Sequence, residues 1–182
     1  MRQYSINDIK QELSYKSSKE LMSLVLKLAK YKKENKELAA YLLFQSDDVD
    51  HYIEQVKLYI KGEFDELLFD NNYKATKQVR KIIRIANKYI KYSGSDKVQV
   101  EVLLLVHDLI QPIAKKKQSY TPYTTILENQ KNKIVKSISK LHEDLQHDYL
   151  KLIQKIKIGY FKLPKILMKI IIALRFLKTS IC

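Results

Sequence analysis

Glycine and proline are scarce in this chain, which contains only 3 of each among its 182 residues. A fold with many strands needs these residues to form its turns. The apolar residues instead recur three and four positions apart, a spacing that places them on one face of an α-helix. Leu, Ala, Lys and Glu, which are common in these runs, favour helices. The sequence therefore predicts an all-α fold.

The predicted helices are joined by short connections, so successive helices are expected to lie antiparallel. Residues 1–112 are expected to form a domain of about six helices. Residues 113–182 are expected to form a basic helical hairpin or arm, packed on that domain. Stacked hairpins fit either a multi-helix bundle or a short α-solenoid of the HEAT or armadillo type. No repeat of fixed period is visible, and the sequence leaves this choice open.

Several helix ends are marked by residues with known capping preferences. Ser5 with Asp8, and Ser17 with Glu20, have the spacing of a capping box. Gly94 can adopt the left-handed conformation that ends many helices. These residues predict the starts of the first two helices and the end of the fifth.

Other boundaries rest on single residues. Asn35 and Ser46 are expected to begin the third and fourth helices. Ser95 or Asp96 is expected to cap the sixth helix, which Pro112 should end because proline has no backbone N–H.

The second half of the chain contains one unresolved choice. Residues 102–106 are continuously apolar, which marks the sixth helix as the most buried element. The apolar spacing over residues 122–158 fits one long helix or two shorter ones. Gly159 is expected to end this region, and Pro164 to begin a last, apolar helix.

The region between Asn71 and Ser95 contains seven basic residues and no acidic one. On a helix of 3.6 residues per turn, six of the seven fall within about 100° of one another, and apolar residues occupy the opposite face. Packing of that apolar face would expose the cations along about 20 Å of helix. We call this set the basic stripe: Lys77, Arg80, Lys81, Arg84, Lys88 and Lys91.

The basic stripe suits a phosphate-rich partner. Cations spaced along a helix can follow the backbone of a nucleic acid without reading its bases. Like charges one turn apart cost an isolated helix a few tenths of a kcal/mol, so stability alone does not favour this arrangement. The net charge of +14 also indicates a polyanion such as DNA or RNA. The alternative is an ordinary solvated face, because only four of the 34 basic residues are arginine.

A second basic segment lies in the predicted loop of residues 114–123. It combines three consecutive lysines with two tyrosines, which can stack on bases. The alternative is a solvated loop. The candidate residues are Lys115, Lys116, Lys117, Tyr120 and Tyr123.

No catalytic motif is present, and no cofactor or metal site is expected. The patterns of the nucleophile elbow and of phosphate-binding glycine loops are missing. His51 and His147 stand among acidic residues, but neither has the HExxH pattern. Compensation of a helix dipole explains the first cluster, and a solvated face the second. His107, within an apolar run, is expected in the core.

The C-terminal tract, residues 162–182, is strongly apolar but contains Lys169 and Arg175. Each would cost about 2.5–3.5 kcal/mol at a bilayer centre, so integral membrane insertion is not expected. A core helix, a helix that binds a protein partner or mediates self-association, and a helix on a membrane surface all remain open. Met1–Lys10 lacks an apolar signal core, and Cys182 is the only cysteine, so a cytoplasmic location is expected.

Two segments resemble small helical proteins of Bacteroidetes-type bacteria. They are Ser18–Phe44 (SKELMSLVLKLAKYKKENKELAAYLLF) and Lys77–Gly94 (KQVRKIIRIANKYIKYSG). The two segments together make up about a quarter of the chain. It implies a bacterial cytoplasmic protein and carries no activity.

Three functional hypotheses follow from the sequence. The first is a non-enzymatic helical binding module whose basic stripe contacts a nucleic-acid phosphate backbone. The second is a protein-interaction scaffold that uses the long helix and the apolar C-terminal helix. The third is peripheral binding to an anionic membrane surface.

Overall fold

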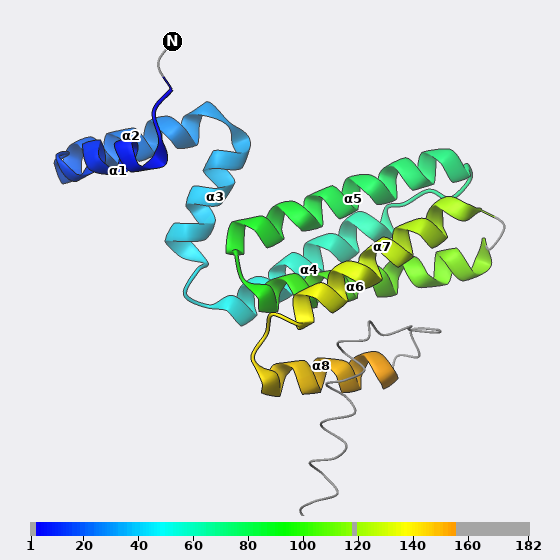
Figure 1. Cartoon of the computed structure of the whole chain (residues 1–182). Helices are drawn as coiled ribbons and strands as arrows, with labels where there is room; N and C mark the ends of the chain where they lie inside the picture. Colours follow the sequence, from blue (N-terminus) through cyan, green and yellow to red (C-terminus); the bar gives the residue numbers. More distant parts are fainter. Residues whose placement is uncertain (1–2, 118–119, 156–182) are drawn as a thin grey trace, which may run out of the picture.

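The computed structural model describes residues 3–117 and 120–155, which contain eight α-helices and no strand (Figure 1). The predicted all-α fold is confirmed. The helices are α1 (Ile6–Ser14), α2 (Ser18–Tyr31), α3 (Lys33–Phe44), α4 (Val49–Asp65), α5 (Asn72–Ser93), α6 (Asp96–Lys116), α7 (Thr121–Ile138) and α8 (Glu143–Lys155).

The predicted caps of the first two helices are confirmed. Ser5 and Ser17 each form a capping box, with Asp8 and Glu20 as the third helical residue. Gly94 ends α5 with a φ of 60°, which lies in the left-handed region that glycine adopts without strain. Ser95 then caps α6, so the chain reverses direction over two residues.

Three predicted helix starts or ends are wrong. The third helix, α3, begins at Lys33, two residues before Asn35. The N-cap of α4 is Asp48 instead of Ser46, because the Asp48 carboxylate accepts a hydrogen bond from the His51 N–H at 2.9 Å. The α6 helix continues through Pro112 to Lys116. Proline has no N–H to donate to the carbonyl four residues earlier in the helix. Pro112 is exposed, so water can donate a hydrogen bond to that carbonyl instead.

The region after residue 121 forms two helices and not one. The chain leaves the helical conformation after Ile138 and resumes it at Glu143. The Gln146 side chain of α8 donates a hydrogen bond to the carbonyl of Leu141, which lies in this connection, at 2.7 Å. The predictions for Gly159, Pro164 and the last helix lie outside the described residues.

The central element of the fold is α6, which packs against α4, α5 and α7. The predicted burial of this helix is confirmed, since Val102, Leu103, Leu104 and Val106 are at most 5% exposed, while Leu105 is half-buried. A helix with neighbours on so many sides must be apolar around most of its circumference.

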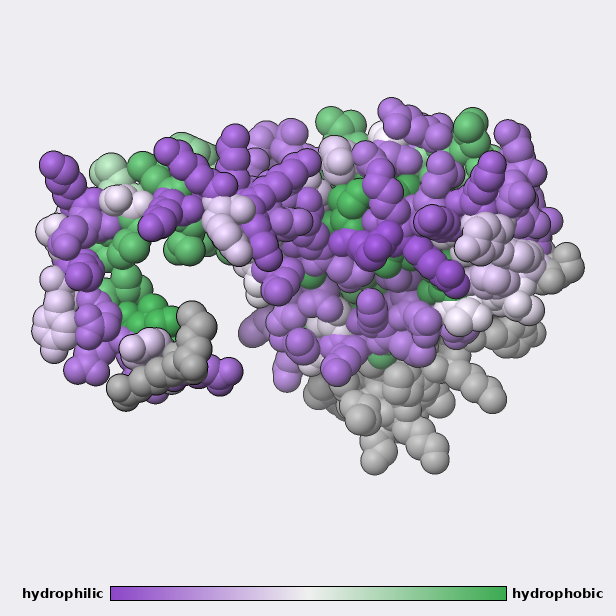
Figure 2. Space-filling view, turned by 90° about the horizontal axis from the view of Figure 1, so that it is seen from above, coloured by the Kyte–Doolittle hydropathy of each residue, from purple (hydrophilic) through white to green (hydrophobic). Residues whose placement is uncertain are grey.

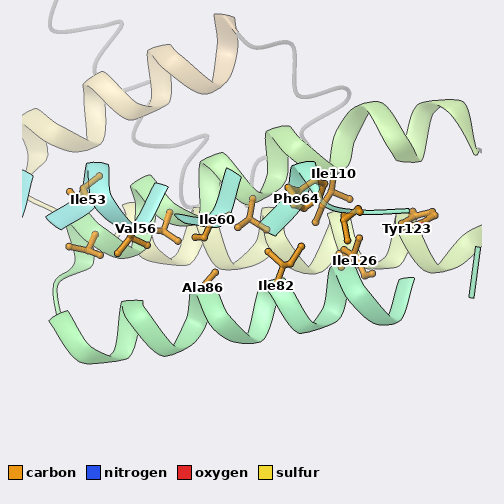
Figure 3. Packing of buried hydrophobic residues seen from close by; sticks show 14 of the residues in the cluster. Ile53, Val56, Ile60, Phe64, Ile82, Ala86, Ile110, Tyr123 and Ile126 are labelled. Atoms are coloured by element: carbon orange, nitrogen blue, oxygen red, sulfur yellow. The ribbon is translucent and has the colours of Figure 1, made fainter. Parts of the chain in front are cut away.

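Two clusters of buried side chains surround α6. The first joins α4, α5, α6 and the start of α7, and its side chains point toward one another in Figure 3. The second joins α6, α7 and α8 through Leu103, Ile134, Ile138 and Tyr149. The α6 helix contacts α4 as well as its successive neighbours α5 and α7, and this arrangement fits a helical bundle. The boundary at residue 112 falls inside α6, and both sides contribute to the same clusters.

The first three helices form an arm that projects from the bundle (Figures 1 and 2). Neither α1 nor α2 has a buried residue. The α2 helix packs on α3, and the Asn35 side chain donates a hydrogen bond to the Leu28 carbonyl at 2.9 Å. Figure 2 shows hydrophobic side chains on the arm beside the open space that separates it from the bundle.

Among the described residues, no helix has both the length and the apolar character needed to cross a membrane. The C-terminal tract, residues 162–182, is not among these residues.

Candidate functional site

The basic stripe lies on the outer face of α5. Lys77, Arg80, Lys81, Arg84 and Lys91 are exposed, and Lys88 is half-buried. On the opposite face of the helix Val79, Ile82 and Ala86 are buried against the bundle. Figure 2, which views the molecule from the side where α5 lies uppermost in Figure 1, shows that most of this face is hydrophilic.

One edge of the basic stripe is neutralised by acidic residues of other helices. The Lys88 Nζ lies 2.6 Å from Glu37 Oε2 of α3. The Lys81 Nζ lies 3.5 Å from Glu63 Oε2 of α4. These two lysines connect α5 to its neighbours, and their charges are already compensated.

Glu37 is held in its ionised form at this edge. Its Oε2 accepts hydrogen bonds from the Lys88 Nζ and, at 3.0 Å, from the Tyr92 hydroxyl. Burial alone would raise the pKa of Glu37, but these hydrogen bonds outweigh burial and lower the pKa below its usual 4.5. In turn, burial and the Glu37 carboxylate raise the pKa of Tyr92. The ion pair at Lys88 is thus part of the structure that joins the arm to the bundle.

The other edge of the basic stripe borders a groove. The groove has a volume of about 750 Å³ and lies between α5 and the start of α7. Three cations of the basic stripe line it, together with aromatic and apolar side chains. The lining residues are Tyr73, Thr76, Lys77, Arg80, Ile83, Arg84, Tyr120 and Pro122.

The cations of the groove have no acidic partner among the residues that the structure describes. Every Asp and Glu of the chain lies within residues 3–117 and 120–155. In that part of the chain, Lys77, Arg80 and Arg84 form no ion pair, whereas Lys81 and Lys88 do. These three uncompensated charges give the groove a positive potential that favours an anion.

Two tyrosines flank these cations. Tyr73 precedes Lys77 by one helical turn and is 74% exposed. Tyr120 is half-buried, and its ring contacts Tyr123 edge-to-face with the ring centroids 5.4 Å apart. The groove therefore combines cations with aromatic rings on one surface.

The candidate residues of the second basic segment do not form one site. Lys115 and Lys116 belong to the last turn of α6 and are exposed. The Lys117 Nζ donates hydrogen bonds to the Phe69 carbonyl, at 3.3 Å, and to the Asn72 side chain, so this lysine ties α6 to the start of α5. Tyr123 is wrong as a stacking candidate, because it is fully buried in the core.

Lys91 and Asn87 lie in the second half of α5, outside the groove. Lys91 is exposed in the last turn of α5, where a cation interacts favourably with the helix dipole. The Asn87 side chain donates a hydrogen bond to the Ile83 carbonyl at 2.7 Å. Its amide nitrogen is thus occupied by its own helix, which gives no support to the reading of bases by α5.

None of the four histidines, all of which the structure describes, lines the groove. His107 is fully buried, as expected; its Nδ1 lies 3.3 Å from the Asp108 carboxylate, and its Nε2 has no hydrogen-bond partner in the described part of the chain. Among the residues that the structure describes, no three His, Cys, Asp or Glu side chains gather in a way that could hold a metal ion.

Sequence patterns identified the cations of the groove but not the groove itself. Tyr73 lies on the same helical face as Lys77, a signal that the periodicity of α5 contains. Tyr120 and Pro122 come from another helix, and no local pattern in the sequence predicts their approach to Arg80 and Arg84.

Comparisons with known proteins add no relative. No protein-family model matches the chain, and neither a curated protein nor a solved structure does.

Proposed function

We propose that this protein is a non-enzymatic helical binding module that contacts the phosphate backbone of a nucleic acid through α5. One observation carries the proposal: Lys77, Arg80 and Arg84 line a groove of about 750 Å³ without any acidic partner in the described part of the chain. Lys91 extends this row beyond the groove. Lys81 and Lys88, which are paired, contribute less to the binding of a phosphate.

The number of uncompensated cations predicts the salt dependence of binding. Three or four neutralised phosphates give a slope of log K against log salt of about −2.7 to −3.6 on duplex DNA, and about −2.1 to −2.8 on a single strand. If all six cations of the stripe bound phosphates, the duplex slope would be about −5.4. A salt series by fluorescence anisotropy separates these two values.

Charge reversal tests which cations are involved. The variant Lys77→Glu/Arg80→Glu/Arg84→Glu is compared with Lys19→Glu/Lys27→Glu/Lys30→Glu, which makes the same change in net charge on the exposed surface of α2. We expect the groove variant to lose at least roughly tenfold in affinity and the control to lose much less. Equal loss in both variants would assign binding to net charge, and unchanged affinity in the groove variant would remove α5 from the interface.

The two other hypotheses have less support. The predicted long helix is divided into α7 and α8, whose apolar residues Ile134, Ile138 and Tyr149 pack in the core instead of facing a partner. The C-terminal tract of the scaffold hypothesis lies outside the described residues. The membrane hypothesis is tested by flotation. If the protein floated with anionic vesicles and did not bind oligonucleotides, a lipid surface would become the proposed partner in place of the nucleic acid.

A further inference from the structure

The groove between α5 and α7 offers more than phosphate contacts. A convex helix with cations alone can lie along any polyanion, but here the cations border a hollow that also contains tyrosine rings. Rings beside cations are the combination found in proteins that hold single strands, where the cations follow the backbone and the rings stack on bases.

The two rings differ in how they are held. Tyr120 contacts the buried Tyr123, so its ring has a fixed position at the end of the groove. Tyr73 is 74% exposed, and its ring therefore gains little from burial in the protein. A ring that is free on one side and stands one turn from Lys77 is available to a base.

The apolar lining of the groove also favours a base. Ile83 and Pro122 are half-buried, and Thr76 is buried with its hydroxyl donating to the Asn72 carbonyl at 2.7 Å. These groups present an apolar surface between the cations and the rings. In a duplex the bases are paired and stacked on one another, and their faces are not available to such a surface.

We infer that the groove binds a single-stranded nucleic acid, with successive phosphates of the strand on Lys77, Arg80 and Arg84 and an unpaired base against Tyr73 and Tyr120. This inference rests on the proposed function and adds the class of nucleic acid. Stacking on a ring does not depend on base identity, so the groove selects single strands without selecting a sequence.

Substitution of Tyr73 separates stacking from charge. Tyr73→Ala is expected to weaken binding of a single-stranded oligonucleotide by roughly 5- to 150-fold, the value of one stacked base. Tyr73→Phe keeps the ring and should bind as the wild type does. Tyr15→Ala is the control, because Tyr15 is 73% exposed and lies at the end of α1, away from the groove.

Three probes are used with each variant at one salt concentration: a single strand, the duplex of the same sequence, and a strand with abasic positions. The wild type should prefer the single strand, and Tyr73→Ala should reduce the affinity for this strand toward that for the abasic strand, with Tyr120 still present. Circular dichroism melting checks that each variant remains folded.

The outcomes distinguish this inference from the proposed function. Equal affinity for single strand and duplex, or an unchanged affinity in Tyr73→Ala, overturns the inference, whereas sensitivity to charge reversal at Arg80 and Arg84 would still support phosphate binding. Failure to bind any of the three probes overturns both.

Discussion

The two edges of α5 carry the same kind of residue but are used differently. On one edge, Lys81 and Lys88 meet Glu63 and Glu37 at 3.5 Å and 2.6 Å. On the other edge, Lys77, Arg80 and Arg84 face a groove and no acid in the described residues. The difference shows that a row of cations on a helical wheel is not one functional unit. Only the neighbours of the helix decide which charges are available to a partner.

The largest expected effect on stability is that of Lys88→Glu. This change places a second carboxylate against Glu37, in a site where both side chains are less than one third exposed. We expect the free energy of unfolding to fall by about 3 kcal/mol, because an ion pair is replaced by a repulsion. Urea unfolding measures the difference. Arg84→Glu is the matched control on the other edge and should change stability by less than about 0.5 kcal/mol.

A smaller effect is expected for Glu37→Gln. The amide cannot replace the charge that Lys88 and Tyr92 stabilise, and we expect a loss of about 1–3 kcal/mol at pH 7. Because the pKa of Glu37 is lowered in the folded protein, its contribution is present above the unfolded value of 4.5 and disappears as the pH falls through the folded pKa. Unfolding of both proteins between pH 7 and pH 3 should show the two curves converge. A difference that stays constant with pH would contradict the role of the ionised carboxylate.

Lys81→Gln should have a still smaller effect. Its side chain is 63% exposed and its distance to Glu63 is 3.5 Å, so the pair is screened by solvent. We expect a loss of at most about 1 kcal/mol, and a smaller one at high salt. Thermal melts at low and high ionic strength test this. A loss as large as that of Glu37→Gln would show that the second ion pair is equally important.

The smallest effect on stability is expected for Lys77→Gln, since this lysine forms no ion pair within residues 3–117 and 120–155. The free energy of unfolding should stay within about 0.5 kcal/mol of the wild-type value. Binding to an oligonucleotide should nevertheless weaken, and the salt slope should become shallower by about 0.7–0.9, because one phosphate contact is lost. A loss of stability without a change in the salt slope would show that Lys77 stabilises the fold and does not bind phosphate, which contradicts the role given to this edge of α5.

The sequence predicted those parts of the structure that depend on neighbouring residues. The spacing of Val79, Ile82 and Ala86 assigned the buried face of α5, and Gly94 marked its end. The continuous apolar run in α6 indicated its central position. These features follow from helical periodicity and capping, which act within a few residues.

Features that depend on distant residues could not be predicted in this way. Glu37 is separated from Lys88 by 51 positions in the chain, so no local pattern shows that this lysine is paired. The groove likewise requires Tyr120 to approach α5 from another helix. The predicted helix end at Pro112 was wrong because an exposed proline can be tolerated inside a helix that its neighbours stabilise.

The lack of buried residues in α1 and α2 has a consequence for local unfolding. The free energy needed to open a segment depends on the contacts that it loses, and here few are lost. The amide hydrogens of these two helices should exchange with solvent through openings that leave the bundle intact. Those of α6, whose side chains contact several helices, should exchange only when the whole bundle unfolds. A single chain is therefore expected to contain two cooperative units of very different stability.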